Sequence, residues 1–64
     1  MPLGANILKL SKQKNMSLYK IAKESEVSES YINDIVHERK NNPGIIILNK
    51  IARVLGVTVD ELIN

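Results

Sequence analysis

Small polar and acidic side chains, which form directional hydrogen bonds, gather in one short segment of this chain. They are Ser28, Glu29, Ser30, Asn33 and Asp34. No catalytic arrangement accompanies them, because the chain has no cysteine, one histidine, no glycine-rich loop and no carboxylates at metal-ligand spacing. The histidine, His37, is expected near the end of a helix, where a cation suits the helix dipole. The sequence therefore predicts a binding protein with no enzymatic activity, no metal and no cofactor.

The polar cluster lies in the second of two short amphipathic segments that meet at a tight break between Leu18 and Ile35. The small residue Ala22 stands ten positions before the β-branched residue Ile32. This spacing lets two helices cross closely at a wide angle, with the two residues opposite each other. The second helix of such a pair protrudes as a rod that fits the major groove of DNA. The segment therefore predicts a helix-turn-helix.

Length and composition limit the possible architectures. The 64 residues are expected to form one domain over residues 1–64, which buries only about 60% of its extended-chain surface. Its core must be aliphatic, because Phe and Trp are absent and no disulfide is possible. No apolar run approaches the roughly 18 residues of a membrane span, and the N-terminus lacks signal-peptide features. A soluble, cytoplasmic protein without membrane contact is expected.

Charge is distributed in blocks along the chain, although the net charge is only +2. Residues 1–23 carry five Lys and no acid, residues 24–38 carry five acids and no Lys or Arg, and residues 39–53 carry four cations and no acid. Two interpretations are open. The blocks can be solvated helix faces of alternating sign, or two basic shoulders flanking a neutral-to-acidic probe.

Start and stop signals divide the chain into five helices. The first is expected over about residues 3–14, with Ile7 and Leu10 facing inward and Asn15 as a left-handed stop. Three later helices each begin with a capping residue next to an apolar staple. The caps are Ser17, Ser28 and Thr58, and Glu61 completes a capping box with the last of them.

The remaining helix is expected to begin after Pro43 and Gly44 and to end at Gly56. Its predicted core residues are Ile45, Leu48, Ile51, Ala52 and Leu55. Ile46 and Ile47 then fall partly outward. They are either a first turn tucked under the preceding loop or an apolar contact for a second subunit or another protein.

In this order and at these separations, the segments resemble the DNA-binding domain of the Cro/C1-type (XRE-like) repressors. The matching segments are Ile7–Leu10, Ser17–Ala22, Val27–Ile35, Asn42-Pro43, Leu48–Leu55 and Gly56–Leu62. The resemblance implies an all-α, five-helix, lambda-repressor-like fold with a helix-turn-helix. It further implies a sequence-specific transcriptional regulator of the repressor kind. Two copies of it would bind a two-fold operator in double-stranded DNA, with the third helix in the major groove.

Several positions depart from the pattern of this family. Glu26 stands where Gly is usual and Glu38 where Gly or Asn is usual, and a non-glycine residue held in the left-handed region costs roughly 1 kcal/mol. Ser11 and Val36 replace both members of an Arg–Glu pair, so no buried charge is left unpaired. Leu18 stands where the family often has a Gln that touches the DNA backbone, which removes one side-chain anchor.

The resemblance also implies which residues touch DNA. Asn33 can pair with adenine, Glu29 can accept from cytosine N4, and Ser30 can bond either base. The complete set of candidate base-reading residues is Ser28, Glu29, Ser30, Asn33 and Asp34. The candidate phosphate contacts are Ser17, Lys20, Tyr31, Arg39, Lys40, Asn41 and Asn42. Ordinary roles remain open for these residues: Ser28 is a helix cap, Glu29 suits a helix dipole, Asp34 is a solvated acid, and residues 39–42 form a polar loop.

A rival interpretation keeps the fold and changes the function. An antitoxin-like or adaptor module would act on another protein through Ile46 and Ile47, and the acidic third helix favours this reading somewhat. For a homodimer, the candidate apolar residues are Val59, Leu62 and Ile63, with Ile46 and Ile47 as the alternative patch.

Overall fold

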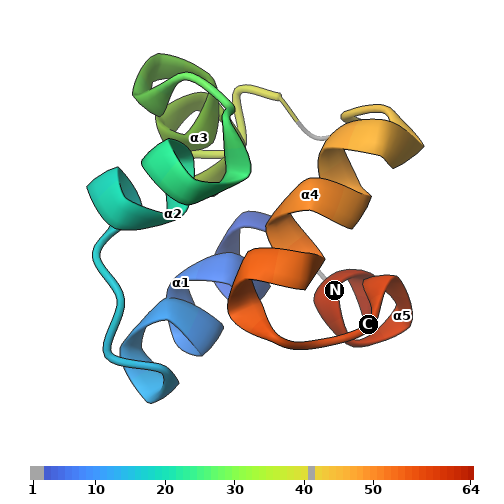
Figure 1. Ribbon diagram of the computed structural model, residues 1–64. Coiled ribbons are helices and arrows are strands. Elements are labelled where there is room, and N and C mark those ends of the chain that lie inside the picture. Colours follow the sequence, from blue (N-terminus) through green and yellow to red (C-terminus); the bar gives the residue numbers. More distant parts are fainter. Residues whose placement is uncertain (1–2, 41) are drawn as a thin grey trace.

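The computed structural model describes residues 3–40 and 42–64, and this part of the chain consists of helices joined by turns and loops, with no strand. The elements are α1 (Leu3–Gln13), α2 (Leu18–Ser25), α3 (Glu29–Val36), α4 (Ile45–Leu55) and α5 (Val59–Ile63). Figure 1 shows their arrangement. The expected all-α, five-helix fold is confirmed. Asn41, a candidate phosphate contact, lies outside the described residues.

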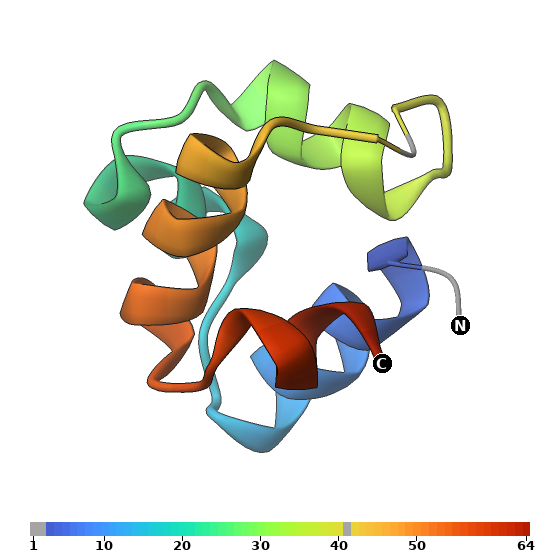
Figure 2. The same cartoon turned by 90° about the vertical axis from the view of Figure 1, so that its right-hand side faces the viewer.

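The helices pack so that α3 has only one buried side. Contacts join α2 to α4, α1 to α3, α2 to α3, α1 to α5 and α4 to α5. Figure 2 shows α1 and α5 side by side at one end of the bundle, with α3 along the opposite edge. The side of α3 that faces away from the bundle is therefore open.

An aliphatic core holds these helices together, as the composition requires. Its fully buried large side chains are Ile7, Ile21, Ile32, Ile35, Ile51, Leu55 and Leu62. Ala22 is 4% exposed and Ile32 is 0% exposed, so both residues of the predicted helix crossing lie in the core. The Nδ2 of Asn6, also buried, donates to the carbonyl oxygen of Leu62 at 2.9 Å and ties α1 to α5.

Gly4 permits a close approach of α1 to the end of α3. A Cβ atom at this position would lie 2.5 Å from the carbonyl oxygen of Ile35, 2.7 Å from that of Val36 and 2.7 Å from Oε2 of Glu38. The first two obstacles are backbone atoms, which cannot move aside without shifting α3. Only glycine therefore fits at this contact.

The predicted helix starts are confirmed in atomic detail. Ser17 Oγ accepts from the backbone N–H of Lys20 at 3.0 Å, and Ser28 Oγ accepts from that of Tyr31 at 3.1 Å. Thr58 and Glu61 form the predicted capping box, with reciprocal bonds of 3.1 and 2.9 Å. These bonds satisfy N–H groups that have no partner inside the helix.

Three non-glycine residues adopt the left-handed conformation, as predicted for their positions. The φ angles are 57° at Asn15, 60° at Glu26 and 62° at Glu38. At the end of α2, the N–H of Val27 donates to the carbonyl of Ala22 at 3.1 Å, which closes the helix behind Glu26.

One part of the predicted core is wrong. Ile45 was expected inside, but its side chain is 60% exposed, and Ile46 is 69% exposed. Ile47 instead packs against the core, four and eight positions before the buried Ile51 and Leu55. Each step of four turns about 40° around a helix, so this stripe puts Ile47, and not Ile45, inside at the first turn.

Replacing Glu26 by Gly should raise the free energy of unfolding by about 1 kcal/mol, because glycine adopts positive φ without steric cost. Urea unfolding followed by circular dichroism measures this change. The matched control is Lys9→Gly, at an exposed position inside α1, which should lower the free energy by about 1 kcal/mol. A loss in both variants would contradict the idea that Glu26 is strained.

Acid should weaken the folded state partly through Glu61. The Thr58 backbone N–H, and secondly the Thr58 side chain, lower the pKa of Glu61 below its ordinary value of 4.5. A carboxyl with a lowered folded pKa stabilises the fold above its unfolded pKa, and this contribution disappears as the pH falls through the folded pKa. The melting temperature of the wild type should therefore fall more steeply than that of Glu61→Gln as the pH drops below 4.5. Parallel pH profiles for the two proteins would contradict this.

Candidate nucleic-acid interface

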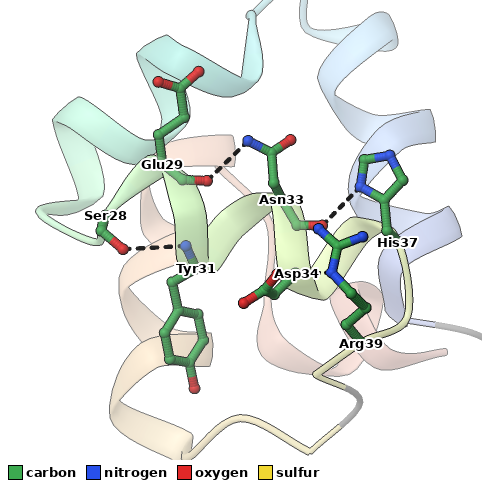
Figure 3. A network of polar contacts seen from close by, with 7 residues as sticks. All are labelled: Ser28, Glu29, Tyr31, Asn33, Asp34, His37 and Arg39. Atoms are coloured by element: carbon green, nitrogen blue, oxygen red, sulfur yellow. Dashed lines mark hydrogen bonds and ion pairs between the residues drawn. The ribbon is translucent and has the colours of Figure 1, made fainter.

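The predicted base-reading residues all lie on or just before α3. Ile32, Ile35 and Val36 bury one side of this helix in the core. Ser28, Glu29 and Ser30 are exposed, and Asn33 and Asp34 are half-buried at the edge. Figure 3 shows the side chains of this region. The structure thus brings the polar cluster together at one protruding helix.

Some of these polar groups already have partners. Ser28 Oγ caps α3, and Asn33 Nδ2 donates to the carbonyl oxygen of Glu29 at 3.1 Å. That carbonyl is one turn back on the same helix and takes one of the two Nδ2 hydrogens, so the second hydrogen and Oδ1 remain for a base. The side chains of Glu29 and Ser30 form no hydrogen bond within residues 3–40 and 42–64, and they can meet a ligand without breaking one.

His37 closes the C-terminal end of α3. Its Nδ1 lies 2.8 Å from the carbonyl oxygen of Asn33. A carbonyl oxygen only accepts, so Nδ1 carries the hydrogen and Nε2 points elsewhere. The expected location at the helix end is confirmed, and Figure 3 shows the imidazole turned back along the helix.

Cationic residues of the α3–α4 loop are folded against the end of α3. The carbonyl oxygen of Asp34 accepts from the backbone N–H of Arg39 at 2.7 Å and from that of Lys40 at 3.0 Å. The Nζ of Lys40 lies 5.7 Å from the centroid of the Tyr31 ring, within the range of a cation–π contact. Tyr31 itself is half-buried and packs against the core. Three candidate phosphate contacts are therefore close neighbours, and Asn42 is exposed just beyond them.

A second basic group lies at the start of α2. Ser17 and Lys20 line an open hollow there, together with Ser11, Lys12, Asn15 and Met16. The Nζ of Lys20 is 3.8 Å from Oε2 of Glu24, which is a loose and exposed ion pair. Lys12 was not among the predicted phosphate contacts. Sequence spacing could not show that α1 brings it beside the cap of α2.

Two neighbouring residues at the start of α2, Leu18 and Tyr19, have opposite surroundings. Leu18, which replaces a polar residue of the family pattern, packs against the core. Tyr19 is 60% exposed and lines a hollow beside Ser28 and Glu29. A lone aromatic residue without a motif around it gave no sign of this location.

The predicted dimer surfaces need correction. Leu62 is 0% exposed and belongs to the core, so it cannot contact a second subunit. Val59 is half-buried against the core, and Ile63 is 38% exposed. The alternative patch consists of Ile45 and Ile46, because Ile47 turns inward.

Residues 3–40 and 42–64 contain no group of three or more His, Cys, Asp or Glu side chains that could hold a metal ion. No helix among these residues combines the length and hydrophobicity needed to span a bilayer.

Comparison with known proteins places this arrangement in a family. A helix-turn-helix family profile matches residues 7–62. The HTH-type transcriptional regulator SinR of Bacillus licheniformis is 36% identical over 62 residues, which are 97% of this chain and 56% of SinR. The chain thus spans about half the length of the curated relatives it matches.

Solved structures agree with this match. A crystal structure of SinR, the master regulator for biofilm formation, in complex with DNA superposes with a TM-score of 0.92 at 34% identity. The match covers 97% of this chain and 98% of that one. The SinR/SinI protein complex also has a TM-score of 0.92 at 34% identity, over 97% of this chain and 60% of that one.

Proposed function

The chain belongs to the helix-turn-helix family, and from this premise we propose that it is the DNA-binding unit of a sequence-specific transcriptional regulator, a repressor of the Cro/C1 type. One observation carries the proposal: α3 has an open polar side, and candidate phosphate donors lie at the start of α2 and in the α3–α4 loop. A protruding helix flanked by such donors has the layout that DNA requires. The SinR structure that contains DNA supports the same reading.

In this proposal the N-terminal half of α3 reads base edges. Glu29 accepts from cytosine N4, and Ser30 bonds either base. Asn33 pairs with adenine through Oδ1 and the Nδ2 hydrogen that its bond to Glu29 leaves free. The Oγ of Ser28 accepts the capping bond, so Ser28 contributes through its hydroxyl hydrogen.

Phosphates are bound on both sides of α3. Lys20 and the capped N-terminus of α2 take one backbone segment, where N–H groups and the helix dipole favour an anion. Arg39, Lys40, Asn42 and the Tyr31 hydroxyl take another. Asn41 keeps the phosphate role that its sequence position predicts. A protein acting in this way works in the cytoplasm, on the nucleoid, and needs no cofactor.

The proposal is tested by titrating an operator obtained by selection from random duplexes. Asn33→Ala should relax the preference at one base position and weaken the best site by roughly 1–3 kcal/mol. Lys40→Ala should weaken all duplexes alike and reduce the slope of log affinity against log salt by about one unit. If the wild type binds no duplex at low or high salt, the proposed function is wrong. If both variants change specificity in the same way, α3 does not read bases.

A protein-interaction module is the second candidate function. The specific observation in its favour is the pair of exposed aliphatic side chains Ile45 and Ile46, 60% and 69% exposed, at the start of α4. The SinR/SinI complex supports this candidate in that a longer protein containing this fold, 60% of which is covered by the match, assembles with another protein. Under this reading, DNA binding would be absent or independent of sequence.

Little apolar surface is available for pairing two copies through α5, because Leu62 is buried in the core. Sedimentation should therefore show mostly monomer at micromolar concentration, and a two-to-one complex on a two-fold operator whose half-sites lie about one helical turn apart.

Substitutions identify the contacting surface. If the α4 patch pairs the copies, Ile45→Lys with Ile46→Lys should abolish cooperative binding while leaving a single half-site bound. Ile63→Lys is the control for the α5 surface. A tight dimer in the absence of DNA would contradict the expectation of a weak interface.

A further inference from the structure

Asp34 makes a contact that no family pattern predicted. Its Oδ1 accepts from Nε of Arg39 at 2.9 Å, across the turn that ends α3. The backbone carbonyl of Asp34 also holds the N–H groups of Arg39 and Lys40. One residue of α3 therefore fixes both the path of the loop and the side chain of Arg39.

Resting on the proposed function, we propose that Asp34 is a positioning residue, whose carboxylate aims the guanidinium of Arg39 at a DNA phosphate, and that it does not read a base. Its Oδ1 already has a cationic partner, and the side chain is half-buried at the edge of α3. This bond fixes the direction of the carboxylate along the turn, so only Oδ2 is left without a partner among the described residues.

The bond to Asp34 leaves the two Nη groups of the Arg39 guanidinium open. The contact uses Nε, the guanidinium nitrogen nearest the aliphatic part of the side chain. No hydrogen bond within the described residues uses the two Nη groups. These groups carry the paired donors that suit a phosphate. Asp34 thus orients the plane without occupying the donors that a phosphate needs.

Stability alone does not explain the pair. The side chain of Arg39 is 60% exposed and that of Asp34 is 36% exposed, so the ion pair lies in contact with water. Exposed pairs contribute little to folding. Holding a long side chain in one orientation before binding does lower the entropy cost of the complex.

Asp34→Asn should change the affinity for DNA in the direction opposite to the one that electrostatics alone predicts. A negative charge beside DNA repels phosphates, so its removal should strengthen binding. If Asp34 positions Arg39, Asp34→Asn should instead weaken binding, by about two- to five-fold, which is the range expected for one exposed ion pair. The loss should be equal on all duplex sequences.

A double-mutant cycle tests this with wild type, Asp34→Asn, Arg39→Ala and the double variant on the selected operator and on a scrambled duplex. In the Arg39→Ala background, Asp34→Asn should cause no loss, or a small gain. The matched control is Glu26→Gln, which removes an exposed acid at the α2–α3 turn and should leave affinity equal or higher. Thermal unfolding verifies that each variant is folded.

An NMR readout is independent of DNA. The Hε resonance of Arg39 should be observable and slow to exchange in the free wild type, and it should broaden in Asp34→Asn. Each of three results would overturn the proposal: unchanged or tighter binding by Asp34→Asn, an equal loss without Arg39, or a loss confined to one base position. If the wild type binds no duplex at all, the proposed function fails, and an unchanged Arg39 Hε signal in Asp34→Asn would separately refute the positioning.

Discussion

Burial of one side of α3 is the interaction on which the rest of this structure depends. A helix of eight residues is too short to be stable alone in water. Ile32, Ile35 and Val36 anchor it in the core, and the small side chain of Ala22 lies in the same core on α2. Because these contacts hold the helix from one side only, its opposite side can remain polar and open to a ligand.

The features that could be predicted from sequence are local ones. A cap, a staple or a left-handed stop depends on a few adjacent residues, so Ser17, Ser28 and Thr58 were recognisable as helix starts, and Glu26 as a strained turn. The resemblance to Cro/C1-type repressors then supplied the fold in which these helices are arranged. The identity of the core as purely aliphatic followed from composition.

The errors concern contacts that depend on the tertiary structure. Helical periodicity could not tell whether Ile45 or Ile47 would meet the core, because this depends on how far the first turn of α4 reaches past its neighbours. Leu62 satisfied the pattern of a surface contact and of a core residue equally well. The bond between Asp34 and Arg39 was not predicted, because the left-handed turn expected at Glu38 does not say which side chains the returning loop brings together.

Gly4 shows how a position remote from the proposed interface bears on it. The absence of one methyl group lets α1 lie directly against the backbone carbonyls that end α3. The methyl group of alanine at this position would push α1 and the end of α3 apart, and α3 would tilt. In the proposed complex with DNA, a small tilt of α3 would change which base pairs its side chains reach. Under the proposed function, a change in α1 would therefore alter operator preference while every predicted DNA contact stays the same.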